Sequence, residues 1–147
     1  MNKLKFKIVT PEKVVYQKEI DQVTLPTQSG EITVLPNHVP LLSALKAGEL
    51  VIKEEGKEIA LAVSGGFVEI RANEVIVLTD SAERAEEIDE ERAQAARLRA
   101  EKLMEEMKNR EDVDYTSLAS KLEKELARLK VVRKRKHGEM PKIETEQ

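Results

Sequence analysis

The sequence predicts an N-terminal antiparallel β-sandwich followed by a C-terminal antiparallel hairpin of two helices. Residues 1–79 consist of short apolar runs interrupted by Gly and Pro, as in many-stranded β domains. Residues 80–137 contain neither Gly nor Pro, and 30 of these 58 residues are Asp, Glu, Lys or Arg. We therefore expect a sandwich over 1–80, a hinge or linker over 81–88, a helical hairpin over 89–137 and a disordered tail over 138–147.

The expected strands begin with an alternation in which Leu4, Phe6 and Ile8 are separated by lysines. A period of two indicates a strand with one buried face. Turn residues then separate further β-rich runs, and two pairs of these runs read as hairpins. The further strands are expected at 14–16, 20–25, 32–35, 49–53, 57–63, 67–70 and 75–78.

The two expected helices each carry one apolar stripe on a charged surface. In the first helix the stripe is Ala93, Ala96, Ala100, Leu103 and Met107, and in the second it is Leu118, Leu122, Leu126 and Leu129. We expect the leucines of one helix to pack over the alanines of the other, with residues 109–114 as the connection. Because alanines bury little surface, at ~25 cal/mol per Å² this seam opens at a cost of a few kcal/mol.

Charge is distributed unevenly along the chain. The formal net charge is −3, which gives no global sign of a nucleic-acid partner. Residues 80–114 carry −6 and residues 115–147 carry +4, so the two helices attract each other and the second leaves a basic surface for an acidic partner.

Several classes of chemistry are missing from the sequence. With no cysteine and two histidines, the chain has no thiolate nucleophile and no Cys- or His-based metal site. It has no phosphate-binding glycine loop and no nucleophile elbow. No apolar run reaches the roughly 20 residues that span a bilayer. We therefore expect no catalytic residues, no metal, and contact with a membrane only through a partner.

Residues 30–42 combine two functional possibilities. Pro36 and Pro40 bracket an Asn-His pair, and the apolar Leu41 and Leu42 follow. One interpretation is a strand, a rigid turn and another strand. The other is a docking loop, because a proline-stiffened loop loses less entropy on binding.

Three motifs together resemble the ε subunit of F-type ATP synthase (δ in mitochondrial naming). Residues 30–42 resemble the family pattern Gly-Glu-x-x-x-Leu-Pro-x-His-x-Pro-Leu. Residues 64–69 resemble its Ser-Gly-Gly-Phe strand pair, and residues 88–93 resemble its Ile/Leu-Asp-x-x-Arg-Ala motif. Their order matches the family over almost the whole chain, from residue 4 to residue 133.

The resemblance implies a non-catalytic rotor subunit of the proton-translocating enzyme. Such a subunit docks through its sandwich on the γ subunit and on the polar loops of the c-ring, at the cytoplasmic face of the bacterial cell membrane. The implied docking residues are Glu31, Pro36, His38 and Pro40. A second interpretation of His38 is a turn histidine that bonds to nearby backbone.

The motif at 88–93 has a local and a functional interpretation. Asp89 can cap the first helix and pair with Arg92, and many such motifs only start helices. Arg92 and Arg99 also lie seven residues apart near a helix N-terminus, where two arginines can hold a polyphosphate. In bacterial members of the resembled family this motif binds ATP as a regulatory ligand, and no cofactor is required. The implied nucleotide-binding residues are Glu83, Ile88, Asp89, Arg92, Ala93, Arg99 and Lys124, and Ser117 stands where the family pattern has arginine.

The resemblance also implies two states of the helical hairpin. Folded, the hairpin packs on the sandwich and ATP stabilises it. Extended, its second helix meets acidic surface of the α/β catalytic hexamer and inhibits ATP hydrolysis. The implied inhibitory contacts are Lys121, Lys124, Arg128, Lys130 and Arg133, continued by Lys134, Arg135 and Lys136.

Three alternatives stay open at this stage. The basic residues of the second helix can be an ordinary solvated face. The chain can be a free-standing β-sandwich adaptor that dimerises through its helical arm. A small hydrolase is a third class, although the sequence offers no nucleophile with a base.

Overall fold

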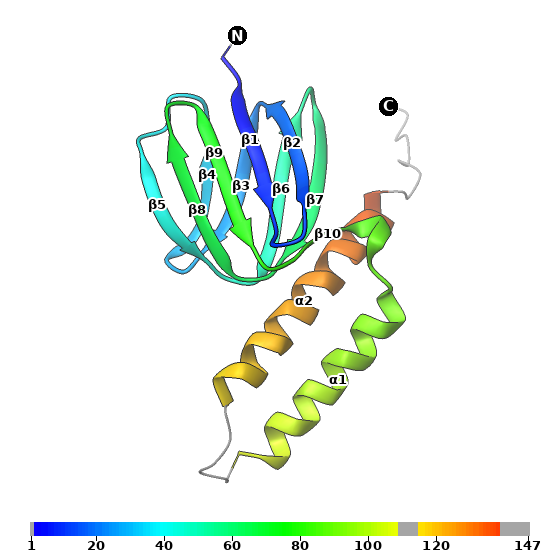
Figure 1. Cartoon of the computed structure of the whole chain (residues 1–147). Coiled ribbons are helices and arrows are strands. Elements are labelled where there is room, and N and C mark those ends of the chain that lie inside the picture. Colours follow the sequence, from blue (N-terminus) through cyan, green and yellow to red (C-terminus); the bar gives the residue numbers. More distant parts are fainter. Residues whose placement is uncertain (1, 109–114, 139–147) are drawn as a thin grey trace, which may run out of the picture.

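The computed structural model describes residues 2–108 and 115–138, with the side chains of all of these except 135–138. Figure 1 shows a β domain below which two antiparallel helices extend, so the predicted fold class is confirmed. The predicted connection at 109–114 and all of the predicted tail except Gly138 lie outside the described residues.

The chain forms the elements in a simple order, with all strands before both long helices. In sequence these are β1 Leu4–Val9, β2 Val14–Ile20, β3 Gln22–Thr27, β4 Gly30–Val34, β5 Leu41–Leu45, β6 Gly48–Glu54, β7 Lys57–Val63, β8 Gly66–Arg71, β9 Glu74–Thr79, β10 Ala82–Arg84, the short 3-10 helix η1 Ala85–Glu87, α1 Glu90–Glu106 and α2 Tyr115–Gly138.

The strands form one strongly curved sheet in the order β10-β7-β6-β3-β5-β8-β9-β1-β2, with β4 paired to β3. Neighbouring strands in the described residues are antiparallel except β1 and β9, which run parallel with Phe6 opposite Val75. This parallel pair is possible because almost the whole domain lies between the two strands, as a parallel connection requires.

The sandwich core contains the side chains that the period-two pattern predicted. Leu4, Phe6 and Ile8 of β1 are buried to 1% exposure or less. They pack with Ile20, Val23, Leu25, Leu50, Ile52 and Leu61 in one apolar cluster.

Gly66, where β8 begins, is required by close packing of the backbone. A Cβ placed on this residue would lie only 1.9 Å from the carbonyl oxygen of Leu78 on β9. Any side chain at position 66 would therefore force β8 and β9 apart, which explains the second glycine of the Ser-Gly-Gly-Phe motif.

Several strands depart from the sequence prediction. β2 extends to Ile20, which was expected to begin the next strand, and β5 was expected only in the strand-turn-strand interpretation of residues 30–42. β3 continues through Pro26, whose carbonyl accepts a hydrogen bond of 3.0 Å from the Lys46 amide. Within the expected linker at 81–88, residues 82–84 form β10 on the edge of β7, and residues 85–87 form η1. A three-residue strand with two charged side chains carries too little local pattern to be predicted, because its partner edge determines it.

The helical pair is attached to the sandwich through α2. This helix packs against β6 and β7, and α1 packs on α2 (Figure 1). A second apolar cluster joins the parts and contains Ala62 of β7, Ile88, Ala93 of α1, and Ala127, Leu129, Val131 and Val132 of α2.

The predicted leucine-over-alanine seam is only partly correct. Ala93, Ala100 and Leu129 are buried, but Leu103 and Leu126 are 39% and 43% exposed. The single-stripe prediction for α2 was wrong because this helix touches two neighbours. Leu129 belongs to the predicted stripe, whereas Ala127 and Val131 line clefts shared with the sandwich.

Candidate functional site: the junction of sandwich and helices

The segment that joins the two parts is held on the sandwich. Glu83 of β10 lies opposite Ala62 of β7 in the ladder. The Arg84 guanidinium lies over the ring of Tyr16, 5.7 Å from its centroid. Residues 82–84 of the expected hinge are therefore bonded into the sheet.

Tyr16 strengthens this attachment. Its hydroxyl donates a 3.0 Å hydrogen bond to Oε2 of Glu54. Burial, followed by the hydrogen bond to Glu54 and its negative charge, raises the pKa of Tyr16 to about 12, and Arg84 opposes the shift. The phenol therefore stays neutral and continues to donate its hydrogen bond across the physiological pH range.

The motif at 88–93 starts α1. Oδ1 of Asp89 accepts a 3.1 Å hydrogen bond from the Arg92 backbone amide, so Asp89 is the N-cap. Ile88 and Ala93 are buried in the second apolar cluster. The predicted cap is present, and its partner is the backbone of Arg92.

The two arginines predicted to bind nucleotide, Arg92 and Arg99, lie at the surface, whereas Ile88 and Ala93 are buried. The side chains of Arg92 and Arg99 are exposed, and neither has an ion-pair partner within 2–108 and 115–134. Two uncompensated guanidinium groups on the exposed side of α1 leave their hydrogen-bond donors available for an anion.

The structure joins Glu83 to Arg128. A guanidinium nitrogen of Arg128 lies 3.1 Å from Oε2 of Glu83, and another lies 2.9 Å from Oε2 of Glu125. The side chains of Glu83 and Arg128 are 24% and 19% exposed. A residue predicted to bind nucleotide thus pairs with a residue predicted to make inhibitory contacts, which sequence spacing did not reveal.

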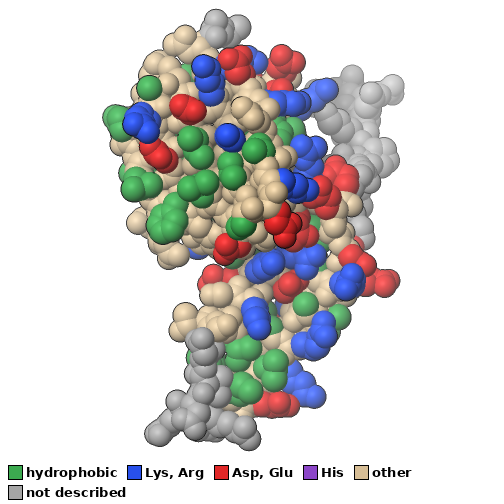
Figure 2. Space-filling view, viewed as in Figure 1, with side chains coloured by type: hydrophobic (Ala, Val, Ile, Leu, Met, Phe, Trp, Pro, Cys, Tyr) green, Lys and Arg blue, Asp and Glu red, His purple; other side chains and the backbone are tan. Residues whose placement is uncertain are grey.

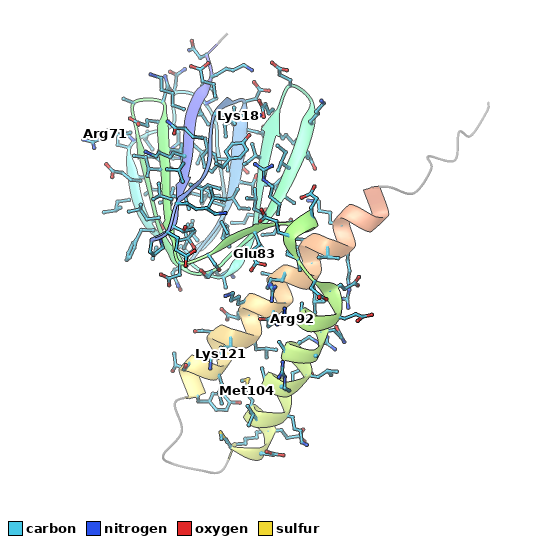
Figure 3. All side chains as sticks on the ribbon, turned by 45° about the vertical axis from the view of Figure 1, so that its right-hand side comes forward. Lys18, Arg71, Glu83, Arg92, Met104 and Lys121 are labelled. Atoms are coloured by element: carbon cyan, nitrogen blue, oxygen red, sulfur yellow. The ribbon has the colours of Figure 1, made fainter. Side chains whose placement is uncertain are left out.

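Other basic residues of α2 point to different parts of the junction. Lys121 and Lys124 line a cleft of about 490 Å³ between α2 and the near end of the sandwich, together with Lys46 and Asp80. Figure 3 shows Glu83 near the start of the helical pair, Arg92 in the first turn of α1 and Lys121 farther down α2. Lys124 precedes Arg128 by one turn, so the two cations lie on the same side of α2.

The remaining basic residues lie on the last turns of α2. Lys130 and Lys134 both approach Glu49 of β6, at 4.0 Å and 3.3 Å from its Oε1. Arg133 is exposed. The side chains of Arg135 and Lys136 lie outside the described residues.

The docking residues separate into two groups. Pro36, His38 and Pro40 lie in the loop between β4 and β5, where Nδ1 of His38 lies 2.6 Å from the Val39 carbonyl. Glu31, at the other end of β4, lines a cleft beside Leu126 of α2. Glu31 and Val34 are three residues apart on β4, ~10 Å at ~3.3 Å per residue, and His38 lies beyond the strand in a turn where its amide donates to the Leu35 carbonyl. The structure therefore does not bring Glu31 together with the proline loop.

The sandwich also presents an apolar face, which we define as Leu42, Phe67 and Leu78. These side chains are 72%, 58% and 53% exposed and lie on β5, β8 and β9. Phe67 is directly opposite Leu78 in the ladder. Figure 2 shows hydrophobic side chains gathered over this part of the sandwich.

Only part of this face was expected from the sequence. Leu42 was expected to follow a possible docking loop, whereas Phe67 was noted only in the Ser-Gly-Gly-Phe motif and Leu78 only as a strand residue. The signal was available in the pairs Phe67-Val68 and Val77-Leu78, which are apolar on both faces of a strand. Such pairs are typical of sheets that are covered on both sides.

Neither a metal cluster nor a membrane helix is seen in the described part of the chain. Residues 2–108 and 115–134 bring no three His, Asp or Glu side chains together as metal ligands. The helices α1 and α2 are not long and apolar enough to cross a bilayer.

Comparison with known proteins gives two family matches that divide the chain near η1. Residues 3–85 match the β-sandwich domain of the ATP synthase delta/epsilon chain, and residues 86–133 match the long α-helix domain of the same chain.

Individual relatives cover most of the chain. The ATP synthase epsilon chain of Desulforamulus reducens is 47% identical over 123 residues, which are 84% of this chain and 92% of the relative. The epsilon chain of Dehalococcoides mccartyi is 47% identical over 136 residues, 92% of this chain and 96% of the relative.

Two solved structures share the fold. A chain of the Euglena gracilis mitochondrial ATP synthase superposes with a TM-score of 0.72 at 24% identity, covering 82% of this chain and 76% of that one. A chain from the central stalk and c-ring of the Tetrahymena thermophila mitochondrial ATP synthase gives 0.55 at 17% identity, covering 91% and 96%.

Proposed function

Because the chain belongs to the ATP synthase delta/epsilon family, we propose that it is a rotor subunit that couples F1, the catalytic head, to the c-ring. The epsilon chain is an accessory subunit of the complex and not a catalytic one. The observation that carries the coupling role is the apolar face, because three large hydrophobic side chains exposed on adjacent strands call for a partner.

The γ subunit is the partner that we assign to the apolar face. Docking there would bury Leu42, Phe67 and Leu78, and the polar loop with Pro36, His38 and Pro40 would contact the polar loops of the c-ring. Glu31 lies at the opposite end of β4, so it would serve a separate contact. The subunit then resides at the cytoplasmic face of the bacterial cell membrane and reaches the membrane only through the complex.

Regulation is the second part of the proposal. In the folded state Glu83 and Glu49 hold Arg128, Lys130 and Lys134. In an extended state these cations, with Lys121, Lys124 and Arg133, would contact the α/β catalytic hexamer and inhibit ATP hydrolysis. The small residues of the second apolar cluster support this role, because a joint formed largely by Ala and Val opens more cheaply than a large-residue core.

ATP is the proposed regulatory ligand of the folded state. The exposed Arg92 and Arg99 would hold its phosphates, and Glu83 and Lys124 would add polar contacts. Asp89, as the N-cap, and the buried Ile88 and Ala93 would position the start of α1. The contact with Glu83 adds Arg128 to this set. A ligand at a hundredfold excess over its Kd stabilises the state it binds by ~2.7 kcal/mol, which is comparable to the cost of opening the joint.

The docking proposal is tested by capture of purified γ subunit. Phe67→Asp places a charge in the apolar face and should weaken capture at least about tenfold, since a charge buried without a partner costs several kcal/mol. Val14→Asp is the matched control, because Val14 is 48% exposed on β2, outside the apolar face. Equal capture by both variants contradicts the assignment, and a symmetric dimer in light scattering would support the adaptor alternative.

The inhibitory role is tested by truncation. The chain should end after Glu87, because β10 is paired with β7, η1 follows it directly, and a cut before β10 would expose the edge of β7. Complexes with this truncation should assemble normally and hydrolyse ATP several-fold faster than complexes with the full chain. Unchanged hydrolysis would show that the helices do not inhibit.

Nucleotide binding is tested by calorimetry on the isolated subunit. Arg92→Ala should abolish ATP binding, because the loss of a charge-assisted phosphate contact removes much of the affinity. Arg97→Ala is the control on the same helix, since Arg97 already pairs with Glu101 at 3.8 Å. ATP binding to Arg92→Ala with unchanged affinity would refute the site.

A further inference from the structure

We propose that Glu49 is an electrostatic latch, which holds Lys130 and Lys134 in the folded state and so competes with the acidic partner for the same two lysines. From the sequence, Glu49 was expected only as the first residue of the strand at 49–53. The latch itself concerns only the contact between sandwich and α2, whereas its effect on hydrolysis rests on the proposed function.

The geometry of the latch is that of one carboxylate shared by two cations. Glu49 lies near the start of β6, opposite Ala62 of β7. Its Oε1 lies 3.3 Å from Nζ of Lys134 and 4.0 Å from Nζ of Lys130. The two lysines are four residues apart on α2, so they project from the same side of the helix.

Burial makes this carboxylate dependent on the helix. The Glu49 side chain is 9% exposed, and its Oε2 is buried without a hydrogen-bond partner in the described structure. A buried carboxylate needs compensation by cations, and one unsatisfied oxygen shows that the compensation here is incomplete. When α2 separates from the sandwich, water solvates the Glu49 carboxylate again. This solvation lowers the free-energy cost of breaking the contact.

The latch also lies at the edge of the contact between sandwich and α2. Glu49 lines a cleft with Ala127 and Lys130 of α2, at the edge of the second apolar cluster. Glu83 makes an equivalent contact with Arg128 from the linker. Lys121 and Lys124, farther toward the start of α2, have no carboxylate partner among the described side chains. The sandwich therefore neutralises only the C-terminal half of the basic surface.

The two lysines and Glu49 have different roles in the two states. The lysines would contact sandwich carboxylate when the hairpin is folded and the catalytic subunits when it is extended. Glu49 acts only in the folded state. Replacing Glu49 therefore destabilises the folded state alone, whereas replacing Lys130 or Lys134 destabilises both the folded and the extended state.

Opening is measured by the labelling rate of one engineered thiol. The chain has no natural cysteine, and Ala127 is 6% exposed in the joint, so Ala127→Cys provides a single thiol that reacts only after α2 leaves the sandwich. Glu49→Gln should increase the labelling rate on the order of fivefold, which corresponds to about one kcal/mol. Glu55→Gln is the control, because Glu55 is exposed and pairs with Lys3.

Lys134→Gln separates opening from a direct charge effect on the thiol. Loss of a nearby negative charge favours the thiolate and speeds labelling, whereas loss of a nearby positive charge slows it. The latch predicts that Glu49→Gln and Lys134→Gln both speed labelling, and that the double variant exceeds the larger single effect only slightly. Opposite effects of the two variants, or no change in either, would overturn the latch.

The same variants in the assembled complex distinguish the latch from the proposed inhibition. Glu49→Gln should lower ATP hydrolysis by freeing the extended state. If labelling accelerates but hydrolysis does not fall, the latch stands and the inhibitory role fails. If labelling is unchanged while truncation still raises hydrolysis, the inhibitory role stands and the latch fails.

Discussion

The sandwich and the helical pair are held together by side chains of very different size. The sandwich core contains Phe6, Leu4, Ile8, Ile20 and Leu25, each exposed by 1% or less. The cluster under the helices consists mainly of Ala and Val, with Ile88 and Leu129 as its large members. Since apolar stabilisation scales with the area buried, one chain combines a rigid domain with a joint that opens at low cost.

The polar contacts within the sandwich are also harder to break than those between the sandwich and the helices. Tyr16 and Glu54 bond within the sandwich, and the buried Thr79 hydroxyl donates to the carbonyls of Ser64 and Gly65 at 2.9 Å and 3.0 Å. Between sandwich and helices the polar links of the described residues include ion pairs, among them Glu83–Arg128. Ion pairs at a partly exposed joint are weakened by salt and can be exchanged for other partners, whereas buried hydroxyl bonds cannot.

Of these variants, Phe6→Ala should lower the free energy of unfolding most, and both the sandwich and the helical pair should unfold. Removing a fully buried aromatic side chain costs about 3–5 kcal/mol, and the helices lose their docking surface on β6 and β7 when the sheet unfolds. Urea denaturation measures the loss. Phe67→Ala, at a 58% exposed position, is the control and should cost less than about 1 kcal/mol. Similar losses would show that burial does not set the stability of the sandwich.

Leu129→Ala should break the joint and leave the sandwich intact. Leu129 is 2% exposed and is a large member of the second cluster, so its truncation should cost the helical pair about 2–3 kcal/mol. Hydrogen exchange should accelerate in α1 and α2 but not in β1 or β9. Leu126→Ala, 43% exposed on the same helix, should change little. Faster exchange throughout the sheet would mean that the two regions unfold as one unit.

Tyr16→Phe should weaken the sandwich by about 1–2 kcal/mol through loss of the hydrogen bond to Glu54. It should also change the alkaline limit of stability. Because folding raises the pKa of Tyr16 from 10.0 to about 12, its contribution is complete below pH 10 and is lost as the pH rises to about 12.

Urea titrations across this alkaline range test the assignment. The parent chain should lose more stability between pH 10 and about 12 than Tyr16→Phe does. Tyr115→Phe, at a 45% exposed tyrosine on α2, is the control and should leave the slope unchanged. An identical slope in the parent and in Tyr16→Phe would contradict the assignment.

Asp89→Ala should have the smallest effect, and it should be confined to the helices. Loss of an N-cap costs about 1 kcal/mol, and here it frees the Arg92 amide at the start of α1. Hydrogen exchange in the first turn of α1 should accelerate while the strands stay protected. Asp80→Ala replaces an exposed aspartate outside the cap and should leave that turn unchanged.

Much of the fold was predictable because its signals are local. The alternation at Leu4, Phe6 and Ile8 was enough to predict a strand with a buried face, and the stretch without Gly or Pro was enough to predict helices. Asp89 was predicted as a helix cap from its position alone, and its side chain does cap α1. The three motifs predicted the family, and the comparisons establish it independently.

The parts that were missed depend on neighbours that are distant in the sequence. β10 is a strand only because the edge of β7 is free, and Leu126 is exposed because α2 turns Ala127 and Val131 toward the sandwich. Glu31 and His38 look adjacent in the motif, but Glu31 lies near the start of β4 and His38 lies in the loop after its end.

Local periodicity and turn residues were therefore sufficient for the strands, the helices and the family, since each of these signals is contained in a few consecutive residues. Local sequence signals do not determine which carboxylate pairs with which cation. The packing of α2 on the sandwich determines it. Glu49 and Lys134 are 85 residues apart, and Glu83 and Arg128 are 45 apart. Ion pairing depends on distance in space, so these contacts exist only once α2 lies on β6 and β7. The apolar face likewise depends on strand pairing, because the ladder places Phe67 opposite Leu78.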